Sequence, residues 1–307
     1  MEKYFLNFTI ILLLWFPETL LSQSTYEMKD QDYSEHRIQE LANKLLSNTI
    51  NNKAEKEAYN AELIHILEDE LIKDGAFHYP FYQVKGIGIY TSPDSMIRLF
   101  NWAIAHVDGS YTYETFVIRN NSPYKNDVIH LKAIDVDSID LEEFIGDENH
   151  WPSALYYDLI EKEAYDTKYY ILLAWDGNDR LVHKKWIEVF WFDEDEELKI
   201  GAPIFKKGNL ADLHRVVFRY SAENKLGLSY REDLDRIEFD HLVPERPSLE
   251  GIYSYYGSDL SYDSFYWKTN FWEFVPDIDV DEGVKKRKSD FRVKESVIRE
   301  KKPIYQH

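Results

Sequence analysis

The first repeating apolar pattern in the chain is helical. Apolar side chains recur at steps of three and four residues after Ser34, and again after a polar link over residues 48–53, which places each set on one face of a helix. The second set runs on to Gly75, where we expect the helix to close. The apolar positions are Ile38, Leu41, Ala42, Leu45 and Leu46 in the first set and Ala54, Ala58, Ala61, Ile64, Leu67 and Leu71 in the second. This pattern predicts a helical hairpin within residues 23–80.

From Gly86 onward the pattern changes to short apolar runs with polar turns between them, which is typical of β-strands. Asp108 and Gly109 form the strongest short hairpin signal, and a second turn signal covers residues 176–179. The predicted strands are Met96–Ala105, Tyr111–Arg119, Val128–Ile134, Leu155–Ile160, Lys168–Trp175, Trp186–Phe192, Arg215–Tyr220 and Leu226–Arg231, with one more through Ile237 and Phe239. We therefore expect a mainly β fold over residues 81–283, an antiparallel meander arranged as a sandwich or open barrel, with the helical hairpin before it.

The two ends of the chain carry separate signals. The apolar stretch Tyr4–Phe16 would span roughly 20 Å as a helix, less than the roughly 30 Å of a membrane core. We expect residues 1–22 to be a signal peptide cleaved after Ser22, with export to the periplasm or beyond and no membrane span in the mature chain. Residues 284–307 hold nine Lys and Arg against three acidic residues, which predicts a basic, flexible tail.

Composition narrows the classes of function. The chain has 307 residues, no cysteine and a formal net charge of −20. The absence of cysteine excludes disulfides, thiol catalysis and Cys-ligated zinc. The acidic balance argues against nucleic acid as a partner, because binding to phosphates needs a cationic surface. The sequence also has no His-Glu-x-x-His pattern, Gly-x-Ser-x-Gly elbow or phosphate-binding glycine loop, so no enzyme class is indicated.

The stretch Tyr253–Trp272 is the strongest candidate for binding. Nine of its twenty residues are aromatic, and carboxylates lie among them. Exposed rings beside carboxylates suit a glycan or a protein partner, whereas the same rings packed inward would only fill the core. The candidate binding residues are Asp240, His241, Tyr256, Asp259, Tyr262, Asp263 and Trp267. Asp240, Asp259 and Asp263 also offer the carboxylates for an alternative function, a secreted hydrolase that uses paired acids.

Asp176 and Asp179 are candidate calcium ligands, the one cofactor that the sequence suggests. Carboxylates and loop carbonyls of the segment 176–179 are hard oxygen ligands of the kind that Ca²⁺ takes. Asp and Asn are also ordinary residues of tight turns, because they tolerate left-handed backbone and bond their own chain. Both interpretations stay open.

Several short motifs occur in order along the second half of the chain. They are Trp151…Tyr156-Tyr157, Leu172-Leu173-Ala174-Trp175-Asp176-Gly177-Asn178, Lys185-Trp186-Ile187-Glu188, Gly201-Ala202-Pro203-Ile204-Phe205, Phe218-Arg219-Tyr220-Ser221, Phe239-Asp240-His241-Leu242-Val243-Pro244 and Tyr256-Gly257-Ser258-Asp259-Leu260-Ser261-Tyr262-Asp263. Together they resemble an uncharacterised family of exported proteins from Bacteroidota-type bacteria, over about residues 90–265. The chain differs from members of that family at Ser258 and Leu260, where they tend to have Pro and Gly. The resemblance implies export and a single β-rich unit, and no activity. The sequence thus predicts a non-catalytic envelope protein that binds a protein partner or a glycan.

Overall fold

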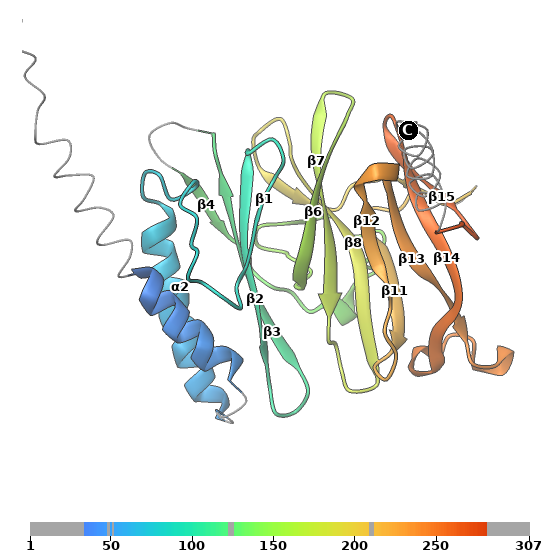
Figure 1. The fold of residues 1–307 in the computed structure, drawn as a ribbon, viewed down its shortest axis with the longest axis horizontal. Coiled ribbons are helices and arrows are strands. Elements are labelled where there is room, and N and C mark those ends of the chain that lie inside the picture. The colour runs from blue at the N-terminus through green and yellow to red at the C-terminus, as the bar shows by residue number, and fades with distance from the viewer. Residues whose placement is uncertain (1–33, 48–49, 51, 122–125, 209–211, 281–307) are drawn as a thin grey trace, which may run out of the picture.

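The computed structural model describes residues 34–47, 50, 52–121, 126–208 and 212–280. The predicted signal peptide and the predicted basic tail lie outside these described residues. Figure 1 shows four layers: a pair of helices, then three β-sheets that we call the first, middle and outer sheets. The predicted fold class, mainly β with N-terminal helices, is confirmed. None of the helices in the described ranges has both the length and the apolar character to cross a membrane.

The helical layer is a hairpin of residues 34–46 and α2 (Lys53–Leu71). Asn52 caps α2, since its side chain accepts hydrogen bonds from the first backbone N–H groups of the helix. α2 ends at Leu71, four residues before the predicted end at Gly75. The leucines of the two helices form one core with the rings of the first sheet: Leu41, Leu45, Leu63 and Leu67 with Phe100, Trp102 and Phe116.

The first sheet is fully antiparallel, and its central strands are covered on both faces, by the helices on one and the middle sheet on the other. Its strands lie in the order β1 (Gly88–Thr91), β2 (Ile97–Ala105), β3 (Tyr111–Arg119), β4 (Asp127–His130). Along β2, alternate side chains point to opposite faces. Phe100 and Trp102 pack on the helices, and Leu99 packs on the middle sheet. The predicted turn at Asp108 and Gly109 joins β2 to β3, and Gly109 has the positive φ of +92° that this tight turn needs.

The middle sheet lies between the other two sheets. Its strand order is β5-β9-β8-β7-β6, and β11 pairs with the first half of β8. Residues 170–174 of β7 are all buried, because alternate side chains enter the two cores on its two faces. The strands are β5 (Gly146–Asp147), β6 (Leu155–Ala164), β7 (Thr167–Asp176), β8 (Val182–Phe192), β9 (Leu198–Ile200) and β11 (Val216–Ser221).

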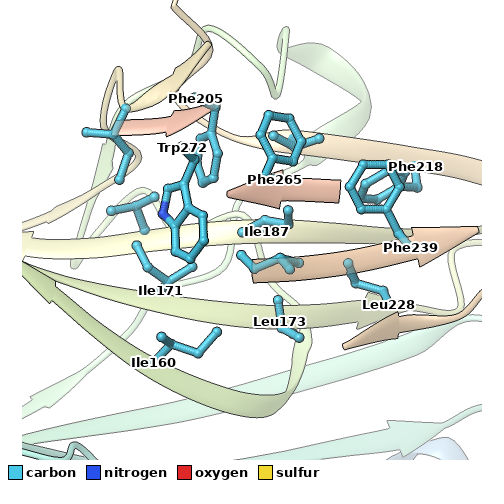
Figure 2. Close-up of a cluster of buried hydrophobic side chains, with 14 of the residues drawn as sticks. Ile160, Ile171, Leu173, Ile187, Phe205, Phe218, Leu228, Phe239, Phe265 and Trp272 are labelled. Atoms are coloured by element: carbon cyan, nitrogen blue, oxygen red, sulfur yellow. The ribbon is translucent and has the colours of Figure 1, made fainter. Parts of the chain in front are cut away.

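The outer sheet covers part of the middle sheet. Its order is β10-β15-β14-β13-β12, and only the β10–β15 pair among its pairings is parallel. Figure 2 shows the core between the two sheets, where Phe265 and Trp272 of the outer sheet meet Ile171 and Ile187 of the middle sheet. The strands are β10 (Phe205–Lys206), β12 (Leu228–Arg231), β13 (Arg236–Pro244), β14 (Tyr256–Lys268) and β15 (Phe271–Val275).

Candidate binding cleft

A cleft of about 480 Å³ opens where β11 of the middle sheet faces β13 of the outer sheet. Four consecutive residues of β11, Val216–Arg219, line one wall, and four of β13, Phe239–Leu242, line the other. Successive side chains of a strand point to opposite faces of the sheet. Four consecutive residues can therefore line the same cleft only if the cleft lies along the backbone of the strand. The cleft therefore runs along the backbone edge of β11.

The floor of the cleft is apolar. The Phe218 ring lies 4.7 Å from that of Phe239, and the Phe239 ring lies 5.7 Å from that of Phe265, measured between ring centroids. Phe274 of β15 completes this group. All four rings belong to the core between the middle and outer sheets. The cleft is therefore an opening into that core, and a ligand that enters it meets phenylalanine.

His241 and Asp263 form a hydrogen-bonded pair on the wall of the cleft. The Nδ1 atom of His241 lies 2.7 Å from Oδ2 of Asp263, and the His241 side chain is 43% exposed. Asp263 is buried, and its Oδ1 accepts a hydrogen bond of 3.0 Å from the backbone N–H of Asp277. The buried carboxylate thus fixes the imidazole, since it is held in turn by the backbone.

A β-bulge places His241 at this position. Asp240 pairs with Tyr262 and Leu242 pairs with Ser258, so His241 alone faces three residues of β14. The middle one, Leu260, has a φ of +72° and is 83% exposed. Local hydrogen bonds hold the bulge: the Leu260 N–H donates to the Ser258 hydroxyl, and the Ser261 N–H and hydroxyl donate to Asp259. Bulges of this kind re-aim side chains next to functional sites.

Asp240 lies beside His241, with its carboxylate directed to β12. Its Oδ2 accepts a hydrogen bond of 2.6 Å from the backbone N–H of Gly227. The cleft therefore holds three carboxylates, Glu142, Asp240 and Asp263, and each is already bonded to a backbone N–H group.

Tyrosines border the cleft at the 3₁₀ segment η4 (Tyr253–Tyr255). The Tyr253 and Tyr256 rings lie 5.2 Å apart, and the Arg219 guanidinium lies 5.6 Å from the centre of the Tyr253 ring. The Tyr256 hydroxyl accepts a hydrogen bond from the backbone N–H of Gly251. Four large apolar side chains of this end of the molecule are exposed: Ile252, Tyr253, Tyr255 and Leu260.

Four of the seven predicted binding residues therefore line one cleft, and three do not. Asp259 is exposed and lies in the bulge. The hydrogen bond from the Ser261 hydroxyl lowers the pKa of Asp259, and His241 adds a smaller effect in the same direction. Tyr262 follows on β14, where its backbone carbonyl accepts from Ile278. Trp267 is at the far end of β14, with its ring 5.2 Å from that of Trp272. The residues that line the cleft are Asp240, His241, Tyr256 and Asp263.

The aromatic segment has two parts. Of the nine rings in Tyr253–Trp272, only Phe265 and Trp272 are buried; the other seven are partly or well exposed. Core filling accounts for these two rings, and Trp267 packs against the same core. Tyr253 and Tyr255 are exposed, as a binding surface requires, and the remaining rings are half-buried. Sequence reasoning missed the other wall of the cleft. Val217 and Arg219 had no signal beyond strand alternation, and Glu142 is far away in sequence.

Asp176 and Asp179 are bonded within their own turn. Asp176 is buried, and its Oδ1 accepts from the Tyr113 hydroxyl at 2.9 Å and from the Asn178 N–H at 2.8 Å. Oδ1 of Asp179 accepts from the N–H groups of Leu181 and Val182, both at 2.7 Å. Within the described ranges, no group of three or more His, Asp or Glu side chains is arranged to hold a metal ion. The turn interpretation accounts for these contacts, and the calcium site stays a prediction.

Searches of protein-family models, curated proteins and solved structures give no match for this chain. The features that bear on function are those of the cleft itself: an apolar floor, a hydrogen-bonded His241–Asp263 pair and exposed rings at its border.

Proposed function

We propose that this chain is an exported, non-catalytic binding protein that takes an apolar segment of a protein partner into the cleft between β11 and β13. The observation that carries the proposal is that the exposed Tyr253 borders a cleft with a phenylalanine floor, while Ile252, Tyr255 and Leu260 of the same stretch of chain are also exposed. Exposed apolar side chains around a pocket with a polar rim are typical of protein interaction sites.

The backbone edge of β11 supports a peptide ligand over a sugar. The Val217 N–H donates to Oε1 of Glu142 at 3.3 Å, so it points away from β8. Because backbone groups alternate in direction along a strand, the N–H of Arg219 also points away from β8, toward the cleft. An extended peptide could bond to this edge while one of its side chains enters the apolar floor.

Charged side chains around the cleft are of both signs. Lys207 and Arg219 are positively charged, and Glu142, Asp240 and Asp263 are negatively charged. Charges of both signs around a binding site add little to the affinity, but they help to select the partner and to orient it. Truncation of an exposed ring should therefore weaken binding more than removal of one rim charge.

The test is selection of peptides from a random 12-residue display library on the immobilised chain, followed by affinity measurement with the selected synthetic peptides. We expect enriched sequences with an aromatic or branched apolar anchor, and at least tenfold weaker binding to Tyr253→Ala. Tyr165→Ala is the matched control, because Tyr165 is also an exposed tyrosine but lies in the β6–β7 turn. Peptides that bind both variants equally well, or a selection that yields no binder, would refute the proposal.

The hydrolase alternative has one observation in its favour, the His241–Asp263 pair. A histidine whose Nδ1 is fixed by a buried carboxylate can act as a base through Nε2. The paired acids of the sequence-based hypothesis are less well placed, because Asp259 does not line the cleft and Asp240 is bonded to Gly227. Turnover of ester or glycoside substrates that disappears in Asp263→Asn, with the fold retained, would favour this alternative over the binding protein.

A further inference from the structure

A second cleft, of about 560 Å³, lies on the middle sheet beyond the area that the outer sheet covers. Its base is a set of side chains on β6, β7, β8 and β11, and the turn over residues 222–226 forms its rim. The base residues are Tyr157, Trp175, His183, Lys185 and Tyr220. Asn224 separates this cleft from the first one, since its Nδ2 donates to the backbone carbonyl of Tyr256 at 3.0 Å.

The rings of the second cleft form a continuous row. Trp175 and His183 have ring centroids 5.5 Å apart, and His183 and Tyr220 have centroids 6.0 Å apart, both pairs edge to face. The register explains the row, because Trp175 is opposite Lys185 and His183 is opposite Tyr220 on neighbouring strands. At about 4.8 Å between strands, three strands give a row of roughly 10 Å.

Each ring is held in place by its neighbours. The Tyr111 ring of the first sheet meets Trp175 edge-on at 5.1 Å. Gly177 makes this possible, because a Cβ there would lie 2.1 Å from the Tyr111 ring. The Tyr157 hydroxyl donates to the backbone carbonyl of Leu228 at 3.2 Å. Tyr220 is buried and supports the row from within, so the surface open to a ligand is Trp175 and His183, both partly exposed. This surface is held rigidly and needs little ordering when a ligand binds.

The polar groups of the second cleft stand beside the rings. Burial lowers the pKa of His183, which favours a neutral imidazole with one donor and one acceptor nitrogen. Burial also lowers the pKa of Lys185, whose Nζ donates to the Leu226 carbonyl at 2.8 Å and lies 5.0 Å from the centre of the Tyr157 ring. The rim adds the side chains of Glu223, Asn224 and Lys225.

We propose that this second cleft binds a neutral glycan. A pyranose ring has an apolar C–H face and a rim of hydroxyls, which matches a single aromatic ring such as Trp175 with hydrogen-bonding groups beside it. A wholly apolar ligand would leave the polar groups of the base and rim unpaired. The rim carries one Glu and one Lys, and the Lys185 ammonium of the base is already bonded to the Leu226 carbonyl, so the charges give little preference for an acidic sugar. This inference stands apart from the function proposed for the first cleft.

The test is calorimetric titration of the chain with three soluble hexasaccharides, of β-1,4-linked glucose, xylose and N-acetylglucosamine. We expect one of them to bind, Trp175→Ala to weaken that binding at least tenfold, and Trp175→Phe to retain most of it. Trp267→Ala is the matched control, a partly exposed tryptophan outside both clefts. Tyr253→Ala, in the first cleft, should also bind the sugar normally.

Two results would overturn the proposal. One is no binding of any of the three hexasaccharides by the intact chain. The other is binding that Trp175→Ala leaves unchanged. Should Trp175→Ala fail to fold, as judged by its circular dichroism melt, Lys185→Met takes its place, since that variant keeps the aromatic row and removes a hydrogen-bond donor. Unchanged affinity in Lys185→Met, together with unchanged affinity in Trp175→Phe, would equally refute a site on this row.

Discussion

The middle and outer sheets are built from the same kinds of residues but differ in how deeply those residues are buried. In the middle sheet, β7 and the second half of β8 are buried on both faces, and even its ion pair Glu188–Arg215 is fully enclosed. In the outer sheet, β13 begins buried and pairs there with residues 263–265 of β14, which are also buried; past the bulge, the side chains of both strands are half-buried or exposed. The regular sheet supplies stability, and the irregular end of the outer sheet supplies the candidate site.

The difference shows how a site can be built without weakening the whole fold. The bulge, the left-handed Leu260 and the exposed rings of η4 lie at one end of the outer sheet, while its other end packs against the middle sheet through Phe265 and Trp272. Unfavourable features at a functional site persist only where the surrounding structure holds them. The core shown in Figure 2 does so here.

The largest expected effect comes from the middle sheet. Trp186 is fully buried between the first and middle sheets. Trp186→Ala should lower the free energy of unfolding by about 3–5 kcal/mol, because it removes a large apolar side chain and leaves a cavity. Tyr255→Ala, at an exposed ring of η4, should change it by less than about 0.5 kcal/mol. Urea denaturation of both variants measures the contrast, and equal losses would contradict it.

The buried ion pair gives an effect that depends on pH. Two guanidinium nitrogens of Arg215, Nε and Nη2, lie 2.8 Å from the two carboxylate oxygens of Glu188. Burial raises the pKa of Glu188, and Arg215 opposes that rise. Arg215→Ala should therefore cost about 3–5 kcal/mol at neutral pH, because it leaves a charge buried without its partner.

The sign of the pH dependence follows from the raised pKa. In Arg215→Ala the pKa of Glu188 rises further above its unfolded value, so the folded state binds the extra proton. Stability is then retained at low pH and lost as pH rises through the folded-state pKa. Denaturation at about pH 5 and about pH 8 should show the larger loss at the higher pH. The double variant Glu188→Leu/Arg215→Met, which buries no charge, should recover most of the stability.

Most of the strands could be predicted from the sequence, because alternation and turn residues are local signals. Tyr111–Arg119 has the predicted bounds, and the turn at residues 176–179 joins β7 to β8 as expected. The stacking of three sheets was not predicted. Its signal was present in the unbroken apolar run 170–174 of β7, which indicates burial on both faces.

The candidate site was predicted only in part, because its parts meet through register. Asp240, His241 and Asp263 were grouped from the sequence, and the β13–β14 pairing brings His241 to Asp263 across 22 residues. Strand β14 itself was missed, since the bulge at residues 259–261 interrupts its alternation. Glu142 and β11 reach the cleft only through the packing of one sheet on another, which leaves no local pattern.

The smallest expected effect on stability comes from Leu260, at the bulge of the outer sheet. A leucine at φ +72° costs about 1–2 kcal/mol relative to right-handed backbone, a conformation that glycine adopts freely. Leu260→Gly should remove this cost, but glycine also gives the unfolded chain more freedom, which takes back roughly 0.5–1 kcal/mol. The free energy of unfolding should therefore rise by up to about 1 kcal/mol. Urea denaturation measures the gain.

The variant separates stability from binding, because the Leu260 side chain is among the exposed apolar groups beside the first cleft. If a protein partner uses that surface, Leu260→Gly should be more stable and yet bind a selected peptide less tightly. Tyr165→Gly is the matched control: Tyr165 has a φ of +52° and is also exposed, but it lies in the β6–β7 turn. It should gain stability and keep its affinity. A loss of affinity in both variants, or in neither, would mean that Leu260 is strained for a reason other than partner binding.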